Sequence, residues 1–144
     1  MRLFIDTWGW IAWRNRDDPR FDEVSRIACE AFERRSITTT NFVVGETITL
    51  VYSRRGGRRG ELFLSDFLDT LALPQVQVEQ ITAEHFGKAI EIRRRYRDKP
   101  KISFTDLTSM VVMHELGITD VLTADKHFAQ VNLGFRLVPG GHKK

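Results

Sequence analysis

The sequence predicts an α/β fold in which a central, mainly parallel sheet is flanked by helices. Short apolar runs that are typical of strands alternate with longer segments whose apolar residues recur at helical spacing. Acidic side chains stand near the points where such strands end and helices begin. With 144 residues, the chain is long enough to bury one substantial core. We therefore expect one domain over residues 1–138, followed by a disordered tail over 139–144.

In the first half of the chain, short strands precede helical segments. Leu3, Phe4 and Ile5 give the first strand its buried character. A short polar oxygen at Thr40 or Asn41 can cap a later helix, because it satisfies free backbone N–H groups. The expected elements are a strand at 2–6, a turn or short helix at 7–13, a helix at 21–35, a strand at 36–39, a helix that ends at 52 and, after Gly56-Gly57, a helix at 58–71.

The second half of the chain repeats this alternation. Thr82 is expected to cap a helix that turns Phe86, Ala89 and Ile90 inward. Ser103 or Thr105 is expected to cap the next helix, and Gly117 is well placed to end it. The expected elements are a strand at 76–81, a helix from 82 to about 96, a helix that ends at 116, a strand at 120–123, a short helix at 124–130 and a strand at 135–138.

Four acidic residues border apolar runs: Asp6, Glu46, Asp106 and Asp125. Asp6 and Asp125 each follow an expected strand, so both belong at the carboxyl edge of a parallel sheet, where sites form. Glu46 and Asp106 lie near the beginnings of helices that leave the same edge. Carboxylates beside buried segments are costly unless they are paired, hydrogen-bonded or bound to a metal. If the four converge, they form a divalent-metal site.

Each of these acids also has a structural explanation. Asp106 can interact with a helix dipole, Glu46 can pair with an arginine, and Asp125 can cap the short helix that follows it. Asp6 stands at the end of a buried strand, where a carboxylate has few structural duties. Asp6 is therefore the strongest individual candidate.

The net charge is only +3, but arginines cluster in two segments, Arg54–Arg59 and Arg93–Arg97. Guanidinium groups bind phosphates in a bidentate manner, so an acidic centre with arginine-rich margins suits a nucleic-acid substrate. The alternative is that these segments are solvated helix ends and loops. The predicted substrate-binding residues are Arg54, Arg55, Arg58, Arg59, Arg93, Arg94 and Arg95.

The sequence resembles the PIN-domain ribonucleases, and among them the VapC-type toxins of toxin–antitoxin pairs. The resemblance extends over essentially the whole chain. It is carried by Phe4-Ile5-Asp6-Thr7, the helix with Glu46, Ser103-Phe104-Thr105-Asp106 and Leu122-Thr123-Ala124-Asp125-Lys126-His127-Phe128.

This resemblance implies a PIN-like three-layer fold with Asp6, Glu46, Asp106 and Asp125 as the catalytic acidic pocket. Asp6 and Asp106 are then the principal metal ligands, and Asp125 is a ligand or acts through water. The resemblance also implies a small antitoxin protein as a partner, for which the Trp8–Trp13 segment is a docking candidate. A homodimer is expected as well, with the helix faces at Leu62–Leu71 as its contact.

The chemistry that these residues predict is metal-assisted hydrolysis of an RNA phosphodiester. Oxygen ligands favour Mg²⁺ or Mn²⁺ over Zn²⁺, and the four histidines have no paired metal spacing. Glu46 is expected to orient the attacking water or to complete a second metal site. Lys126 and His127 are expected to be exposed on the short helix.

Other features limit the remaining functions. A single cysteine excludes an internal disulfide and fits a reducing cytoplasm. No apolar run approaches the roughly 18 residues of a membrane span, so we expect a cytoplasmic protein without membrane contact. A haloacid-dehalogenase-like phosphatase needs a second aspartate where Trp8 stands, and a receiver domain needs an acidic pair on the first strand. Two alternatives stay open, namely an RNA-processing PIN nuclease that is not a toxin and a non-catalytic nucleic-acid-binding module on the same fold.

Overall fold

The computed structural model describes residues 1–140, which form five strands and seven helices around one core. The strands are β1 (Leu3–Ile5), β2 (Ile37–Thr40), β3 (Val76–Glu79), β4 (Asp120–Leu122) and β5 (Arg136–Val138). The helices are α1 (Thr7–Ala12), α2 (Phe21–Glu33), α3 (Asn41–Arg54), α4 (Gly57–Leu71), α5 (Ala83–Arg95), α6 (Phe104–Leu116) and α7 (His127–Gln130).

All five strands form one parallel sheet in the order β3-β2-β1-β4-β5, which confirms the predicted fold class. The central strand β1 is fully buried, and Leu3 is aligned with Ile37 on one side and with Asp120 on the other. The chain advances from β1 through β2 to β3, and then crosses back to β4 and β5. The direction therefore reverses between β1 and β4, which is where open parallel sheets form their binding crevice.

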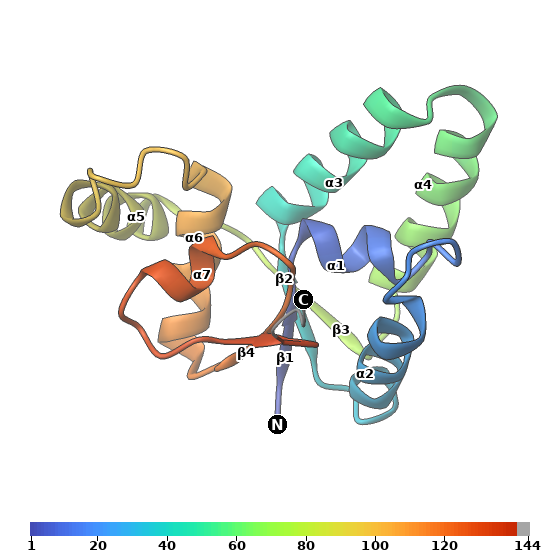
Figure 1. Cartoon of the computed structure of the whole chain (residues 1–144), viewed down its shortest axis with the longest axis horizontal. Helices are drawn as coiled ribbons and strands as arrows, with labels where there is room; N and C mark the ends of the chain where they lie inside the picture. Colours follow the sequence, from blue (N-terminus) through green and yellow to red (C-terminus); the bar gives the residue numbers. More distant parts are fainter. Residues whose placement is uncertain (141–144) are drawn as a thin grey trace.

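Helices cover both faces of the sheet and give three layers. Figure 1 shows α5, α6 and α7 on one side and α2 and α4 on the other, as expected if each parallel crossover is right-handed. The helices α3 and α4 form a hairpin that extends away from the sheet. Gly56, with a φ of 57°, lies at its turn, in a region of backbone space that favours glycine. No helix within residues 1–140 is both long and apolar enough to span a membrane.

Several helix ends follow from single residues. Thr40 caps α3 by accepting the N–H of Val43, and Thr82 caps α5. Gly117 ends α6 in the left-handed conformation, with a φ of 70°. Ser103 caps α6 by accepting the N–H of Asp106, so capping is not the role of Thr105.

The short helix α1 packs unusually close to the sheet. A Cβ atom at Gly9 would lie 2.6 Å from the Leu122 carbonyl oxygen and 2.9 Å from Ile5 Cγ2. Only glycine permits this approach, which holds the segment that follows Asp6 against β1 and β4.

Two expectations for the secondary structure and core are wrong in detail. Phe86 and Ile90 are each 42% exposed, because α5 packs on α6 through the buried Ala89 and Ile92 instead. The predicted helix at 124–130 begins only at residue 127, because the residues before it form a turn.

The predicted disordered tail at 139–144 lies only partly within the described residues. Residue 140 is held in place, since its carbonyl oxygen accepts a hydrogen bond from Arg20 Nη2 at 2.9 Å. The rest of the predicted disordered tail, residues 141–144, lies outside the described residues.

Candidate active site

A cleft of about 410 Å³ opens where the chain leaves β1 and β4. All four predicted acidic residues line it, so the structure brings together side chains that are up to 119 positions apart. The acids are Asp6 directly after β1, Glu46 in the second turn of α3, Asp106 in the first turn of α6 and Asp125 after β4.

Asp6 is the most buried of these acids, with 3% of its surface exposed. The Oγ1 hydroxyl of Thr123 donates to Asp6 Oδ2 at 3.0 Å. Asp6 Oδ1 is buried and has no hydrogen-bond partner among residues 1–140. An ionised carboxylate oxygen in this state loses its hydration without a hydrogen bond in return, which costs on the order of several kcal/mol. A cation bound in the cleft would therefore stabilise the ionised form of Asp6.

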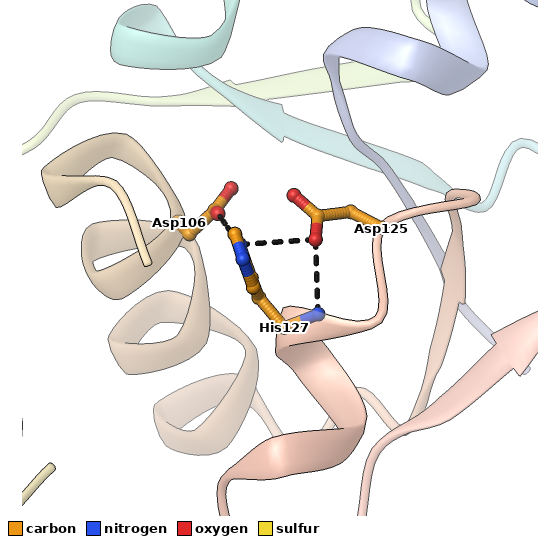
Figure 2. A group of neighbouring side chains, drawn as sticks. All are labelled: Asp106, Asp125 and His127. Carbon is orange, nitrogen blue, oxygen red and sulfur yellow. Dashed lines mark hydrogen bonds and ion pairs between the residues drawn. The ribbon is translucent and has the colours of Figure 1, made fainter. Parts of the chain in front are cut away.

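Asp106, Asp125 and His127 form the second part of the cleft, shown in Figure 2. His127 Nδ1 lies 3.0 Å from Asp106 Oδ2 and 3.0 Å from Asp125 Oδ1. The backbone N–H of His127 donates to the same Asp125 oxygen at 2.9 Å. Asp125 thus does interact with the start of α7, but this turn aims its carboxylate into the cleft.

Glu46 approaches the cleft from α3. Its Oε1 accepts a hydrogen bond from Thr7 Oγ1 at 2.5 Å, which ties α3 to the first turn of α1. Among the residues that the structure describes, Glu46 makes no ion pair, so the alternative of a structural salt bridge to an arginine is not realised.

The electrostatics of the cleft oppose full ionisation of its acids. Burial, reinforced by the negative charge of Asp106, raises the pKa of Asp6 from 3.8 to about 7. Burial also raises the pKa of Asp106, to about 6, although the hydrogen bond with His127 opposes that rise. At pH 7 a substantial fraction of Asp6 is therefore protonated, and a nearby cation would favour the ionised form of both carboxylates.

The predicted substrate-binding arginines are divided among three regions. Arg54 lines the acidic cleft, while Arg55 and Arg59 line a neighbouring groove of about 610 Å³ together with Arg14 and Arg16. We call this second site the arginine groove; it is also lined by Trp13, Phe21, Ser25, Leu62, Phe63 and Asp66. Arg58, Arg94 and Arg95 are exposed and line neither of the two sites.

Arg93 has a structural position that the sequence did not indicate. Its guanidinium donates to the carbonyl oxygens of Ile102, Lys99 and Tyr96 at 2.6, 2.7 and 3.1 Å. These hydrogen bonds hold the loop that leads into α6. The guanidinium group is occupied by these hydrogen bonds and the side chain is half-buried, so Arg93 is not free to bind a phosphate.

Two cleft residues were not expected from the sequence. His127 was predicted to be exposed on a helix, but only 24% of its side chain is exposed and its ring contacts two acids. Its spacing of two residues from Asp125 was the available signal. Lys101 also lines the cleft, two positions before the cap of α6. Lys126 is exposed as predicted.

Comparisons with known proteins agree with this architecture. The PIN domain family matches residues 3–133. The 23S rRNA-specific endonuclease VapC20 of Mycobacterium tuberculosis (strain ATCC 25618 / H37Rv) is 34% identical over 127 residues, which cover 88% of this chain and 92% of that protein.

Solved structures give the same result. The crystal structure of M. tuberculosis VapC20, described as a sarcin-ricin loop cleaving toxin, matches with a TM-score of 0.76 and 30% identity over 91% of this chain and 95% of that one. VapBC2 from Rickettsia felis, bound to a DNA fragment from its promoter, matches with a TM-score of 0.72 and 15% identity over 95% of this chain and 97% of that one. At that identity, the second likeness shows the fold alone.

Proposed function

The chain belongs to the PIN-domain family, and from this premise we propose that it is a divalent-metal-dependent endoribonuclease and the toxin of a type II toxin–antitoxin pair. The observation that carries the proposal is the buried Asp6 Oδ1, which has no hydrogen-bond partner among residues 1–140, in a cleft that Glu46, Asp106 and Asp125 also line. The relative that is 34% identical is an endonuclease specific for 23S rRNA, which makes that RNA the first substrate to test.

The acids of the cleft fit a hard divalent cation, for which Asp6, Asp106 and Asp125 supply carboxylate oxygens. At an effective dielectric of about 20, two carboxylates about 4 Å apart repel each other by roughly 4 kcal/mol. A bound Mg²⁺ or Mn²⁺ would offset this repulsion, lower the pKa of water and neutralise charge on the phosphate. Without a cation, burial and the charge of a neighbouring aspartate raise the pKa of both Asp6 and Asp106.

Glu46 is the acid best placed to act on water. Thr7 fixes one of its carboxylate oxygens, so the side chain has a defined orientation where it lines the cleft. The second oxygen can accept a proton from the water that attacks phosphorus. General-base assistance of this kind contributes about 10²–10⁴-fold to a rate.

Basic residues around the cleft bind the flanking phosphates of the RNA. Arg54 and Lys101 line the cleft beside the acids, and Arg55 and Arg59 continue the positive surface into the arginine groove. Each phosphate contact with an arginine releases condensed counterions, so binding should weaken steeply with salt. Arg58, Arg94 and Arg95 contribute to the general positive field rather than to this path.

The antitoxin binds over the arginine groove and excludes RNA from it. Trp13, Phe21 and Phe63 give the groove an apolar lining that a protein segment can contact. RNA phosphates and an antitoxin would then compete for Arg55 and Arg59. We further propose that the protein acts in the cytoplasm, where its RNA substrate is found, and that it forms a homodimer.

The test is cleavage of purified 23S rRNA and of an unrelated structured RNA, with Mg²⁺ or Mn²⁺ and with or without a chelator. Asp6→Asn and Asp106→Asn should abolish cleavage, and Asp69→Asn, an exposed acid on α4, should not. Cleavage that persists in both cleft variants would reject the proposed site. Tight RNA binding without cleavage of any substrate would support the non-catalytic binding module instead.

A further inference from the structure

His127 lies between two acids of the cleft. Figure 2 shows the side chains of Asp106, Asp125 and His127 pointing toward one another from α6, the turn after β4 and the start of α7. A single ring nitrogen, Nδ1, is 3.0 Å from one oxygen of each acid. One N–H group cannot make two well-aligned hydrogen bonds at once. Nδ1 is hydrogen-bonded to Asp106, so its contact with Asp125 is an ion pair if the ring is protonated, and a neutral ring needs a shared cation to hold all three groups together.

The spacing of the donor atoms suits a shared cation. One ligand atom from each of the three residues lies within 4.8 Å of the others. Neighbouring ligands around an octahedral cation with bonds of about 2.1 Å are about 3.0 Å apart. The two distances from Nδ1 match that edge length, as for adjacent ligands of one ion.

An independent feature of the same cleft also indicates a cation. Asp6 is 97% buried, and its Oδ1 has no partner among the residues that the structure describes. Asp6, directly after β1, lines the same cleft as Asp106, Asp125 and His127. Asp6 thus differs from the members of a surface acidic cluster, whose oxygens water can satisfy.

We propose that His127 Nδ1 is a ligand of the divalent cation, together with Asp106 and Asp125. This inference rests on the proposed metal dependence and narrows the choice of ion. Mg²⁺ takes oxygen ligands almost exclusively, whereas imidazole nitrogen binds divalent ions of the first transition series. A mixed nitrogen and oxygen ligand set makes the site prefer Mn²⁺ to Mg²⁺.

The local backbone supports this role. The N–H of His127 donates to Asp125 Oδ1, so the turn that begins α7 fixes the imidazole and the carboxylate relative to each other. Thr123 Oγ1 accepts the N–H of Asp125 and also donates to Asp6 Oδ2, which links the same turn to the β1 side of the cleft. These hydrogen bonds set the ligand positions before an ion binds.

The test is Mn²⁺ binding to the full-length, chelator-treated protein at one near-neutral pH, followed by electron paramagnetic resonance. Pulsed spectra of bound Mn²⁺ report nitrogen ligands through ¹⁴N modulation, independently of any enzyme activity. We expect imidazole modulation in the wild type and in His114→Asn, a matched control whose histidine is exposed at the end of α6.

The informative variant is His127→Asn, because asparagine keeps an N–H donor near the position of Nδ1 but is a weak metal ligand. The modulation should disappear, and Mn²⁺ affinity should fall by roughly tenfold or more. Affinity for Mg²⁺, measured by displacement of Mn²⁺, should change much less. Thermal unfolding in chelator checks that the variant is folded; if it is not, the wild-type spectrum alone decides.

Three outcomes overturn the inference. Bound Mn²⁺ without nitrogen modulation in the wild type excludes His127 as a ligand. Unchanged Mn²⁺ affinity in His127→Asn assigns the ring a hydrogen-bonding role only. If the protein binds no Mn²⁺, the proposed metal dependence itself is wrong. If Mn²⁺ binds through oxygen ligands alone and this binding is lost in Asp106→Asn, the proposed function stands and only the role of His127 is rejected.

Discussion

Thr123 Oγ1 donates a hydrogen bond to Asp6 Oδ2 at 3.0 Å, across the boundary between β4 and β1. This contact satisfies one oxygen of Asp6 and leaves the other, Oδ1, buried without a partner among residues 1–140. The hydroxyl of Thr123 also accepts the N–H of Asp125. One small side chain therefore connects two of the acids at the point where the strand order reverses.

Replacing Thr123 with valine should disrupt both connections while keeping the shape of the side chain. The loss of hydrogen bonds to a buried carboxylate should lower the free energy of unfolding by about 1–3 kcal/mol. Metal affinity should fall by about 10–100-fold, because a hydrogen bond that orients a ligand is removed. Calorimetric titration with Mn²⁺ and urea denaturation measure the two effects.

A matched control for this change is Thr108→Val. Thr108 is also buried and also loses one hydroxyl hydrogen bond, to the Thr105 carbonyl oxygen, but it does not line the cleft. It should show a loss of stability with little change in metal affinity. Equal metal affinity in Thr123→Val and wild type would show that the hydroxyl does not position Asp6.

Asp6→Asn should stabilise the metal-free protein at neutral pH. The pKa of Asp6 is raised to about 7 in the folded chain, so between about pH 4 and pH 7 the folded state binds more protons than the unfolded state. The free energy of unfolding therefore falls as pH rises through that window, by up to about 4 kcal/mol at 1.36 kcal/mol per pKa unit. The Asp6→Asn variant has no charge to bury at this position, so its free energy of unfolding should not fall in this way.

The measurement is urea denaturation of both proteins in chelator across that pH range. The advantage of Asp6→Asn should be largest above pH 7 and should vanish near pH 4, where Asp6 is protonated. Saturating Mn²⁺ should reverse the order, because only the wild type has the ligand. A variant that is less stable than the wild type in chelator at pH 7.5 would contradict the buried, uncompensated charge.

The sequence was sufficient to predict the convergence of the acids, because that convergence depends on topology. Once β1 and β4 are parallel neighbours, Asp6 and Asp125 must lie at the same sheet edge. Caps such as Thr40 and Thr82 were equally predictable, since the side chain acts on a backbone group three residues away. Helix caps can be predicted from neighbouring residues, and the shared sheet edge can be predicted from the order of strands and helices.

Features that depend on loop geometry could not be predicted in this way. His127 reaches Asp106 only because residues 124–126 form a turn and delay the start of α7. Arg93 looked like a member of a basic cluster, yet its partners are carbonyl oxygens of a loop whose path the sequence does not reveal. On α5, helical periodicity did not decide between two apolar faces, and the buried one contains Ile92 rather than Ile90.

Arg93→Ala should destabilise the protein, although Arg93 belongs to a segment that resembles a phosphate-binding cluster. The change removes three hydrogen bonds to carbonyl oxygens of the 96–102 loop, at a cost of about 2–4 kcal/mol. Arg94→Ala removes an exposed neighbour of equal charge and should change stability by no more than about 0.5 kcal/mol. Urea denaturation compares the two, and equal values would refute the structural role of Arg93.

Gly9→Ala should lower stability and metal affinity together. The new methyl group would lie 2.6 Å from the Leu122 carbonyl oxygen and would push α1 away from the sheet, at a cost of about 1–3 kcal/mol. Because Asp6 is the residue from which α1 begins, the same shift should move its carboxylate and weaken Mn²⁺ binding.

The same substitution in an open helix position should have the opposite effect on stability. Gly87 lies within α5, and a Cβ atom there would meet nothing within 4 Å. Gly87→Ala should therefore stabilise the chain by about 0.5–1 kcal/mol through helix propensity and leave metal affinity unchanged. Urea denaturation and Mn²⁺ titration of both variants measure the two effects. A Gly9→Ala protein that gains stability as Gly87→Ala does would show that α1 does not need its close contact with the sheet.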